Sequence, residues 1–210
     1  QRKIAEALGD ANALIDSLER LLAKKRHLKR GAMQELFVGN RRLPGFTGAW
    51  QARRLAELGS TYGGLTGKTK ADFGRGAARY ITFMNIMTNV VIDPRAFEAV
   101  DVAAAESQNR VKEGDLFFNG SSETPEEVGL CSVLVNEVDG VYLNSFCFGF
   151  RFRDQTLADG LFLAYYFRSS QGRALLWSLA QGATRYNLSK SALPDVLLRL
   201  PEVAEQSALA

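Results

Sequence analysis

The chain has 210 residues, of which 46% are hydrophobic and 10% aromatic, so it carries enough apolar side chains for one folded domain and is not expected to be disordered. The formal net charge is only +3, and the sequence shows neither an apolar run long enough to span a membrane nor a secretory leader. Two cysteines, Cys131 and Cys147, are too few for a disulfide framework, and these features together predict a cytoplasmic protein with reduced thiols.

The first stretch, residues 1–38, predicts one long helix. It contains no proline, and its apolar residues recur at alternating spacings of four and three, which is typical of the seam of a coiled coil. The seam residues are Ile4, Leu8, Ala11, Ile15, Leu18 and Leu22. A helix with a single apolar stripe needs a partner helix, so we expect this stretch to pack against a second one.

The last residues, 201–210, predict where a second helix starts. Residues 206–210 and residues 1–5 share the pattern Gln-x-x-aliphatic-Ala. The repetition predicts a helix–globule–helix arrangement taken from a longer pattern.

Between these ends, residues 39–200 are expected to form one globular domain of mixed helices and strands, giving an α+β fold. Gly39 and Asn40 end the helical pattern. The apolar run at 78–92 predicts one or two strands with a turn near Asn85 and Asn89, and the Ala/Glu-rich run at 96–107 predicts a short helix. Residues 130–138 and 141–152 predict a hairpin across Asp139-Gly140. Residues 161–182 predict two helical pieces, and residues 169–172 are either a break between them or part of one of them.

Charge is distributed unevenly along the globular domain. Residues 53–80 hold six basic residues against two acidic ones, whereas residues 93–140 hold three basic against eleven acidic ones. Such asymmetry fits a protein that lies between a polyanion and a basic partner. The alternative is that these charges only solvate the surface, and composition does not decide between the two.

No catalytic or metal-binding constellation is found in the sequence, and no cofactor is expected. His27 is the single histidine, so one chain cannot supply a histidine-based metal site or a Ser-His pair. Gly67-Lys68-Thr69 resembles the end of a phosphate-binding loop, but that motif requires glycine where Tyr62 stands, and no buried strand precedes it.

Five segments, in this order, resemble the specificity subunit of type I restriction-modification systems. They are IAEALGDANALIDSLERLLAKKRHLKRGAMQELF, RLPGFTGAWQARRLAEL, RYITFMNI, EGDLFFNG and QGATRYNLSKSALPDVLLRLPEVAEQ. The resemblance implies a spacer helix at 1–38, a target recognition domain at 39–200 and the start of a second spacer helix at 201–210. Family members hold two recognition domains and two helices, whereas this sequence holds one recognition domain and one complete helix.

The resemblance also implies function and partners. Each recognition domain would read one half of a bipartite site in double-stranded DNA, and the antiparallel spacer helices would fix the gap between the halves. Methyltransferase subunits and a restriction motor-nuclease subunit would dock on a chain that is itself not an enzyme. The second spacer helix would come from the same full-length chain or from a second copy.

Two segments, 66–79 and 182–190, carry most of the candidate DNA contacts. Basic side chains suited to phosphates are Lys68, Lys70, Arg75 and Arg79, and side chains able to reach base edges are Asn85, Asn119, Ser121, Arg185, Tyr186 and Asn187. Thr66 and Lys190 complete the set. Tyr186 can equally be an aromatic at the edge of the core and Arg185 a surface charge. The alternative function is a dimer mediated by the helix, whose globular domain binds protein rather than DNA.

Overall fold

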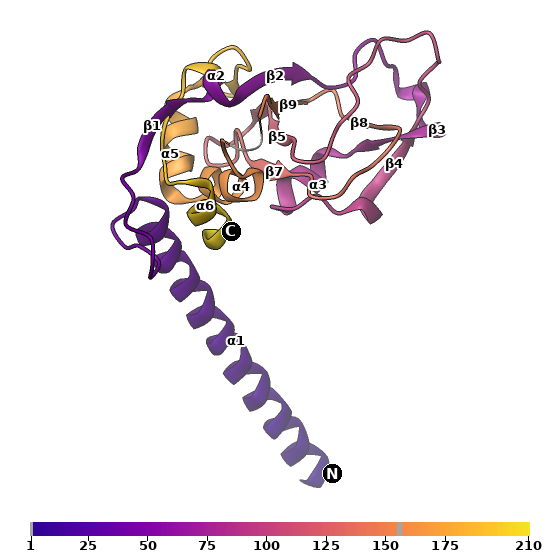
Figure 1. The fold of residues 1–210 in the computed structure, drawn as a ribbon. Coiled ribbons are helices and arrows are strands. Elements are labelled where there is room, and N and C mark those ends of the chain that lie inside the picture. Colours follow the sequence, from indigo (N-terminus) through magenta and orange to yellow (C-terminus); the bar gives the residue numbers. More distant parts are fainter. Residues whose placement is uncertain (1, 155–156) are drawn as a thin grey trace. The chain divides into compact units, whose positions relative to one another are not determined.

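The computed structural model describes residues 2–154 and 157–210 (Figure 1). The chain divides into two compact units, Gln1–Arg41 and Arg42–Ala210, which are described separately. The first unit is dominated by a long helix and the second contains four small sheets with short helices. The predicted α+β fold with a long N-terminal helix is therefore confirmed.

Helix α1 runs over Arg2–Phe37, 36 residues, which corresponds to a length of about 54 Å. Gly39, at φ 75°, follows it and donates its backbone N–H to the carbonyl of Leu36, as glycine commonly does after a helix C-terminus. Large apolar side chains on this helix remain half or more exposed. They are Ile4, Leu8, Leu14, Ile15, Leu18, Leu21, Leu22 and Leu28.

The beginning and the end of the globular unit are paired with each other. Strand β1 (Gln51–Arg54) lies antiparallel to β12 (Leu197–Leu200), and the inward-facing Leu198 and Leu200 are buried. Helix α2 (Leu55–Leu58) follows β1, and α6 (Val203–Leu209) follows β12. Two sequence-distant segments are thus brought to the same edge of the unit.

A four-stranded antiparallel sheet forms the centre of the unit. Its order is β2 (Gly59–Gly63), β9 (Cys147–Phe152), β5 (Leu116–Asn119), β7 (Cys131–Val133). Helices α4 (Gly160–Arg168) and α5 (Ser170–Ser178) cover it (Figure 1), and the rings of Phe118 and Phe167 meet edge to face at 5.3 Å. Ser169 ends α4 and caps α5, which confirms the two predicted helical pieces; the break is at Ser169, and residues 170–172 lie inside α5.

A second sheet joins β4 (Phe97–Val100), β3 (Phe73–Ile81) and β8 (Val141–Leu143), with β3 and β8 parallel. Helix α3 (Phe83–Thr88) follows β3, and Ile86 on α3 shares one buried cluster with Ile81 and Phe117. Short 3-10 turns lie at Lys70–Asp72, Pro94–Ala96 and Leu193–Asp195.

Arg168 connects helix α3, which packs with the second sheet, to strand β7 of the central sheet. From the end of α4 its guanidinium donates to the backbone carbonyls of Cys131 at 2.5 Å and Asn89 at 2.8 Å, and to that of Ile86. Those acceptors belong to β7 and to the C-terminal end of α3, where carbonyls have no partner within the helix. One half-buried arginine thereby connects α4, β7 and the C-terminal end of α3.

Three local predictions are wrong. Residues 83–88 are helical rather than extended, because the Thr82 hydroxyl accepts the Asn85 N–H at 3.2 Å and caps α3. Residues 97–100 form strand β4 instead of a helix. The turn at Gly140 exists, at φ 65°, but it does not form a hairpin: β8 pairs with β3, whereas β9 pairs with β2 and β5.

Candidate nucleic-acid interface

A three-stranded sheet gathers several of the predicted base-contacting side chains. Its strands are β10 (Ala180–Gln181), β11 (Tyr186–Leu188) and β6 (Ser121–Ser122). Asn187 pairs with Ser121 and Tyr186 with Ser122 in the antiparallel register. Arg185 and Asn187 are exposed, whereas Tyr186 is half-buried. The loop at 182–190 and the polar segment near 121, distant in sequence, therefore form one surface.

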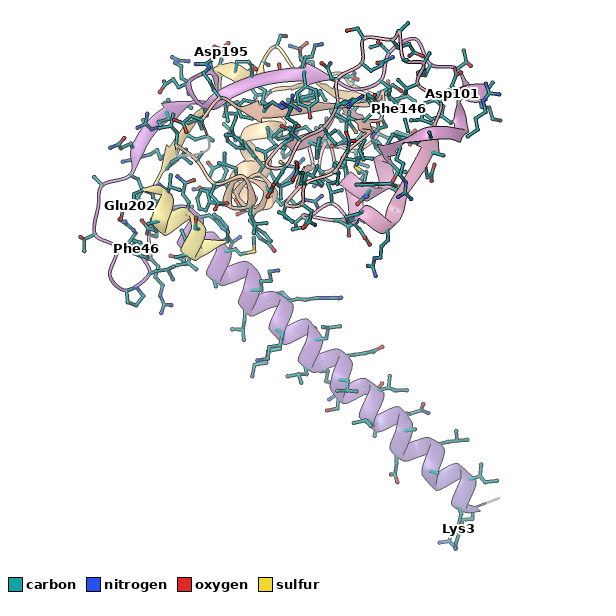
Figure 2. All side chains as sticks on the ribbon, turned by 45° about the vertical axis from the view of Figure 1, so that its right-hand side comes forward. Lys3, Phe46, Asp101, Phe146, Asp195 and Glu202 are labelled. Carbon is teal, nitrogen blue, oxygen red and sulfur yellow. The ribbon has the colours of Figure 1, made fainter. Side chains whose placement is uncertain are left out.

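Phe146, labelled in Figure 2, lies on a tight turn between β8 and β9 and lines one pocket with Ser121 of β6 and with Arg185, which precedes β11. Its carbonyl accepts the N–H of Gly120 at 3.0 Å, and its own N–H donates to the side-chain oxygen of Asn144 at 3.0 Å. Phe83, Ser121, Phe146 and Arg185 line an open pocket of about 260 Å³. This pocket and the exposed residue Asn187 are called the aromatic site below.

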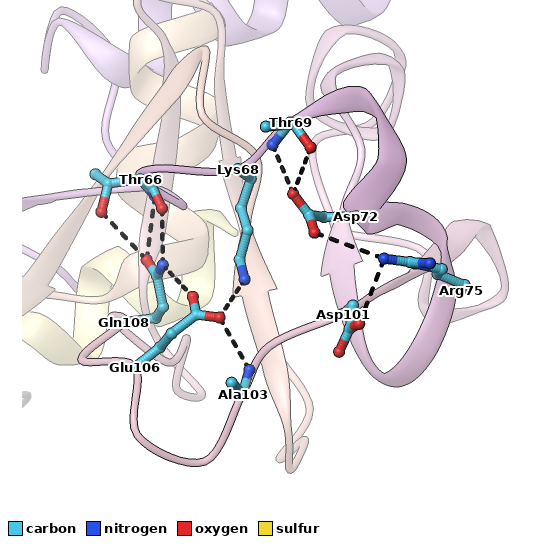
Figure 3. A network of polar contacts seen from close by, with 9 residues as sticks. All are labelled: Thr66, Lys68, Thr69, Asp72, Arg75, Asp101, Ala103, Glu106 and Gln108. Atoms are coloured by element: carbon cyan, nitrogen blue, oxygen red, sulfur yellow. Dashed lines mark hydrogen bonds and ion pairs between the residues drawn. The ribbon is translucent and has the colours of Figure 1, made fainter.

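The basic segment at 66–79 is partly neutralised by carboxylates of the acidic segment (Figure 3). The ammonium of Lys68 lies 2.5 Å from a carboxylate oxygen of Glu106, and the Lys68 side chain is only 6% exposed. Hydrogen bonds from Lys68, from the Gln108 side chain and from the Ala103 N–H together lower the pKa of Glu106 to about 2. Gln108 accepts the backbone N–H of Thr66 at 3.1 Å and donates to its carbonyl at 2.8 Å. Lys68 and Thr66 thus serve the local fold.

Arg75 is held in a similar way. One nitrogen of its guanidinium lies 4.0 Å from Asp72 and 3.8 Å from Asp101. Asp72 also accepts the N–H and hydroxyl of Thr69 at 2.7 and 2.8 Å, and these hydrogen bonds lower its pKa. The two charge-biased segments therefore pair with each other in part, instead of forming one basic flank and one acidic flank.

Lys70, Arg79 and Lys190 are exposed, and within the described residues no carboxylate lies within ion-pair distance of them. Lys190 lies close to the end of β2, since a Cβ placed on Gly63 would be 3.7 Å from its ammonium nitrogen. Gly64, the next residue, touches the backbone of Asn144 in the Phe146 turn. The segment that leads to Thr66 therefore adjoins the aromatic site.

Two predicted base-contacting residues are not on the surface. Asn85 is 2% exposed, donates to the carbonyl of Asp93 at 2.8 Å and accepts the N–H of that residue at 3.0 Å. Asn119 is fully buried and donates to the carbonyl of Ser121 at 3.3 Å. The amide of Asn85 thus satisfies backbone groups of a loop below the surface, whereas that of Asn119 bonds through its N–H₂ alone, since within the described residues its buried oxygen has no hydrogen-bond partner.

Phe83 and Phe146 were not among the residues expected from the sequence. Each stands in an apolar run that resembles a core strand, so the sequence carried no signal of exposure. Only the turn held by Asn144, and the capped start of α3, bring the two rings to the pocket.

Within residues 2–154 and 157–210, no helix has the length and apolar character that crossing a membrane requires. The same part of the chain holds no group of three or more His, Cys, Asp or Glu side chains suited to a metal ion.

No protein-family model and no curated protein matches the sequence, but solved structures do. A chain from a structure that describes complex assembly and conformational transition of the type I restriction-modification system is 17% identical, with a TM-score of 0.60, and the match covers 100% of this chain and 49% of that one. The HsdS subunit from Thermoanaerobacter tengcongensis is 16% identical, with a TM-score of 0.55, over 100% of this chain and 48% of that chain. The chain spans about half the length of these solved chains. It therefore has the fold of type I restriction-modification specificity subunits.

Proposed function

We propose that the chain is the DNA sequence-specificity module of a type I restriction-modification complex and that it reads one half of a bipartite site in double-stranded DNA. The observation that carries this proposal is the aromatic site: an arginine, a serine hydroxyl and two aromatic rings around one open pocket, with an asparagine beside it. Arginine, asparagine and serine are the side chains that read base edges, and exposed lysines nearby supply phosphate contacts.

The organisation that we propose has three parts. Residues 1–38 are the spacer helix, residues 39–200 the target recognition domain, and residues 201–210 the start of a second spacer helix. The exposed apolar residues of α1 support this assignment, because eight large side chains half or more exposed would be costly without a partner helix. The partner is the second spacer helix of the same full-length chain or of a second copy.

The module acts without catalysing a reaction itself. Methyltransferase subunits and a restriction motor-nuclease subunit would dock on the helices and recognition domain and carry out the chemistry on the bound DNA. The absence of a nucleophile–base pair in the sequence supports this division of work. We place the module in the cytoplasm, where a bacterial-type restriction complex meets its DNA.

The test is binding of the purified chain to a pool of random duplexes, with and without a methyltransferase subunit, at several salt concentrations. We expect enrichment of a short motif, sharpened by the subunit. Affinity should fall with salt on a log–log plot with a slope of about −0.9 for each phosphate neutralised. Replacing Lys70 or Arg79 with glutamine should each make that slope shallower by about one unit if it contacts a phosphate.

The control for these variants is Arg199→Gln. Arg199 is exposed on β12, in the strand pair with β1 at the other end of the globular unit from β3 (Figure 1), and its loss should leave the salt slope unchanged. If the Lys70, Arg79 and Arg199 variants all have the same salt slope as the wild type, Lys70 and Arg79 are excluded from the proposed interface.

The second candidate function is a protein-interaction module that dimerises through its helix and does not bind DNA. The ion pairs of Lys68 and Arg75 favour it, since they reduce the positive charge available to phosphates. Absence of DNA binding at every salt concentration, together with dimerisation through α1, would select this function over the first.

A further inference from the structure

The backbone of Phe146 is hydrogen-bonded on both sides although the residue is 67% exposed. Asn144 is 4% exposed, accepts the Phe146 N–H and donates to the carbonyl of Ile81 at 3.1 Å. On the other side, the Phe146 carbonyl accepts the N–H of Gly120. The backbone of Phe146 is thus held by a buried polar network while its ring faces water, and exposure of such a ring is unfavourable for the free protein.

The pocket beside this ring combines an apolar wall with donors. Phe83, half-buried at the start of α3, forms the wall together with Phe146. Arg185 and Ser121 line the same pocket. Among the described residues, neither the Arg185 guanidinium nor the Ser121 hydroxyl has a hydrogen-bond partner. Apolar surface and hydrogen-bond donors therefore face one opening.

The four bases differ in the chemical groups on their major-groove edges, and therefore in how well each edge would fit this pocket. In the major groove, thymine alone presents an apolar group, its C5-methyl, next to a hydrogen-bond acceptor, O4. Guanine presents two acceptors, adenine an acceptor and a donor, and cytosine a donor. A methyl against the two rings, with O4 facing Arg185 or Ser121, matches both properties of the pocket.

We propose that the pocket of Phe83, Ser121, Phe146 and Arg185 receives the major-groove edge of one thymine in the DNA site, with Phe146 contacting the C5-methyl group. This inference rests on the proposed function and makes it specific: it names the base and the side chain that reads it. Arg185 also brings positive charge to the adjacent phosphate backbone.

The test uses the full chain and the duplex selected from the random pool. Each thymine in that duplex is replaced in turn by deoxyuridine, which lacks only the methyl group. For one position we expect binding to the wild-type protein to weaken about fivefold, the effect of losing one buried methyl contact. Phe146→Ala should weaken binding to the thymine duplex by about tenfold and should bind the thymine and deoxyuridine duplexes equally.

Two controls accompany these binding measurements. Trp177→Ala removes another exposed aromatic ring, on α5, and should leave the fivefold difference intact. Thermal unfolding of Phe146→Ala should match that of the wild type, because the ring is mostly outside the core.

Three outcomes would overturn the inference while leaving the proposed function in place: a selected site without thymine, no position sensitive to deoxyuridine, or a Phe146→Ala variant that still discriminates the two duplexes. Failure of the wild-type chain to bind any duplex would overturn the proposed function and this inference with it.

Discussion

Replacing Asp115 with asparagine should destabilise the globular unit more than its single-atom change suggests. Asp115 is 1% exposed, and its carboxylate accepts four hydrogen bonds. The donors are the Tyr62 hydroxyl at 2.6 Å, the Lys112 N–H at 2.8 Å, and Nε and a terminal nitrogen of Arg151 at 2.9 and 2.6 Å. The Arg151 guanidinium also lies 4.8 Å from the centre of the Tyr62 ring, so the cluster joins β2, β9 and the turn before β5.

Oδ2 of Asp115 accepts three of the four bonds and Oδ1 accepts the fourth, from Nε of Arg151. An asparagine whose single oxygen replaces Oδ2 would lose the Arg151 Nε bond, would turn its N–H₂ toward that donor and would remove the negative charge from the other bonds. A hydrogen bond to a charged group contributes about 1.5–3 kcal/mol, so we take the loss as about 3 kcal/mol. The partial exposure of Arg151 to water reduces this, and we expect about 2–3 kcal/mol, a large share of the stability of about 5–15 kcal/mol typical of a domain.

Urea unfolding followed by tryptophan fluorescence measures this loss, because Trp50 and Trp177 both lie in the globular unit. The midpoint should fall by about 1 M urea. The matched control is Asp139→Asn: its side chain is 97% exposed and its ion pair with Arg110 is 3.4 Å long, so the free energy of unfolding should change by less than about 0.5 kcal/mol. Equal midpoints for the two variants would refute the assigned role of the buried cluster.

Two further predictions concern acid stability and the long helix. The folded-state pKa of Glu106, about 2, lies below its ordinary value of 4.5, so the stability that this group contributes is present above pH 4.5 and is lost as the pH falls toward 2. Glu106→Gln should therefore flatten the acid limb of a plot of unfolding free energy against pH, and parallel plots would contradict this. Leu18→Asp, in the exposed stripe of α1, should weaken association between chains in sedimentation experiments, whereas Glu19→Gln should not, and equal association would exclude the stripe as the contact.

The elements predicted correctly are those whose cause is local. The spacing of Leu8, Ile15 and Leu22 determines the helical period, and Ser169 caps α5 within one turn of itself. The wrong predictions concern contacts between residues that are far apart in the sequence. Residues 141–143 pair with β3, and both faces of this strand are buried: Val141 and Leu143 lie in one apolar cluster and Tyr142 in another, which no alternating pattern encodes.

For the candidate site too, local features were predicted correctly and contacts between distant segments were not. Arg185 and Asn187 were expected from their own polar loop, but the pocket exists only because the turn of Phe146 and the start of α3 meet that loop. Asparagine was ambiguous for a physical reason: the same amide that reads a base edge also satisfies buried backbone groups, and Asn85 and Asn119 do the latter.

Pairing between the charged segments bears on how such a module would act. Lys68 with Glu106, and Arg75 with Asp101, reduce the positive charge that DNA phosphates would meet, so the sequence-independent part of binding should be small. A weak non-specific term raises the relative contribution of base contacts at the aromatic site. In the proposed complex, two such half-sites joined by spacer helices would gain affinity from their linkage, since the second contact forms at a high effective concentration. Weak binding by one half would then follow from the charge pairing, and tight binding by the assembled complex from the linkage of two halves.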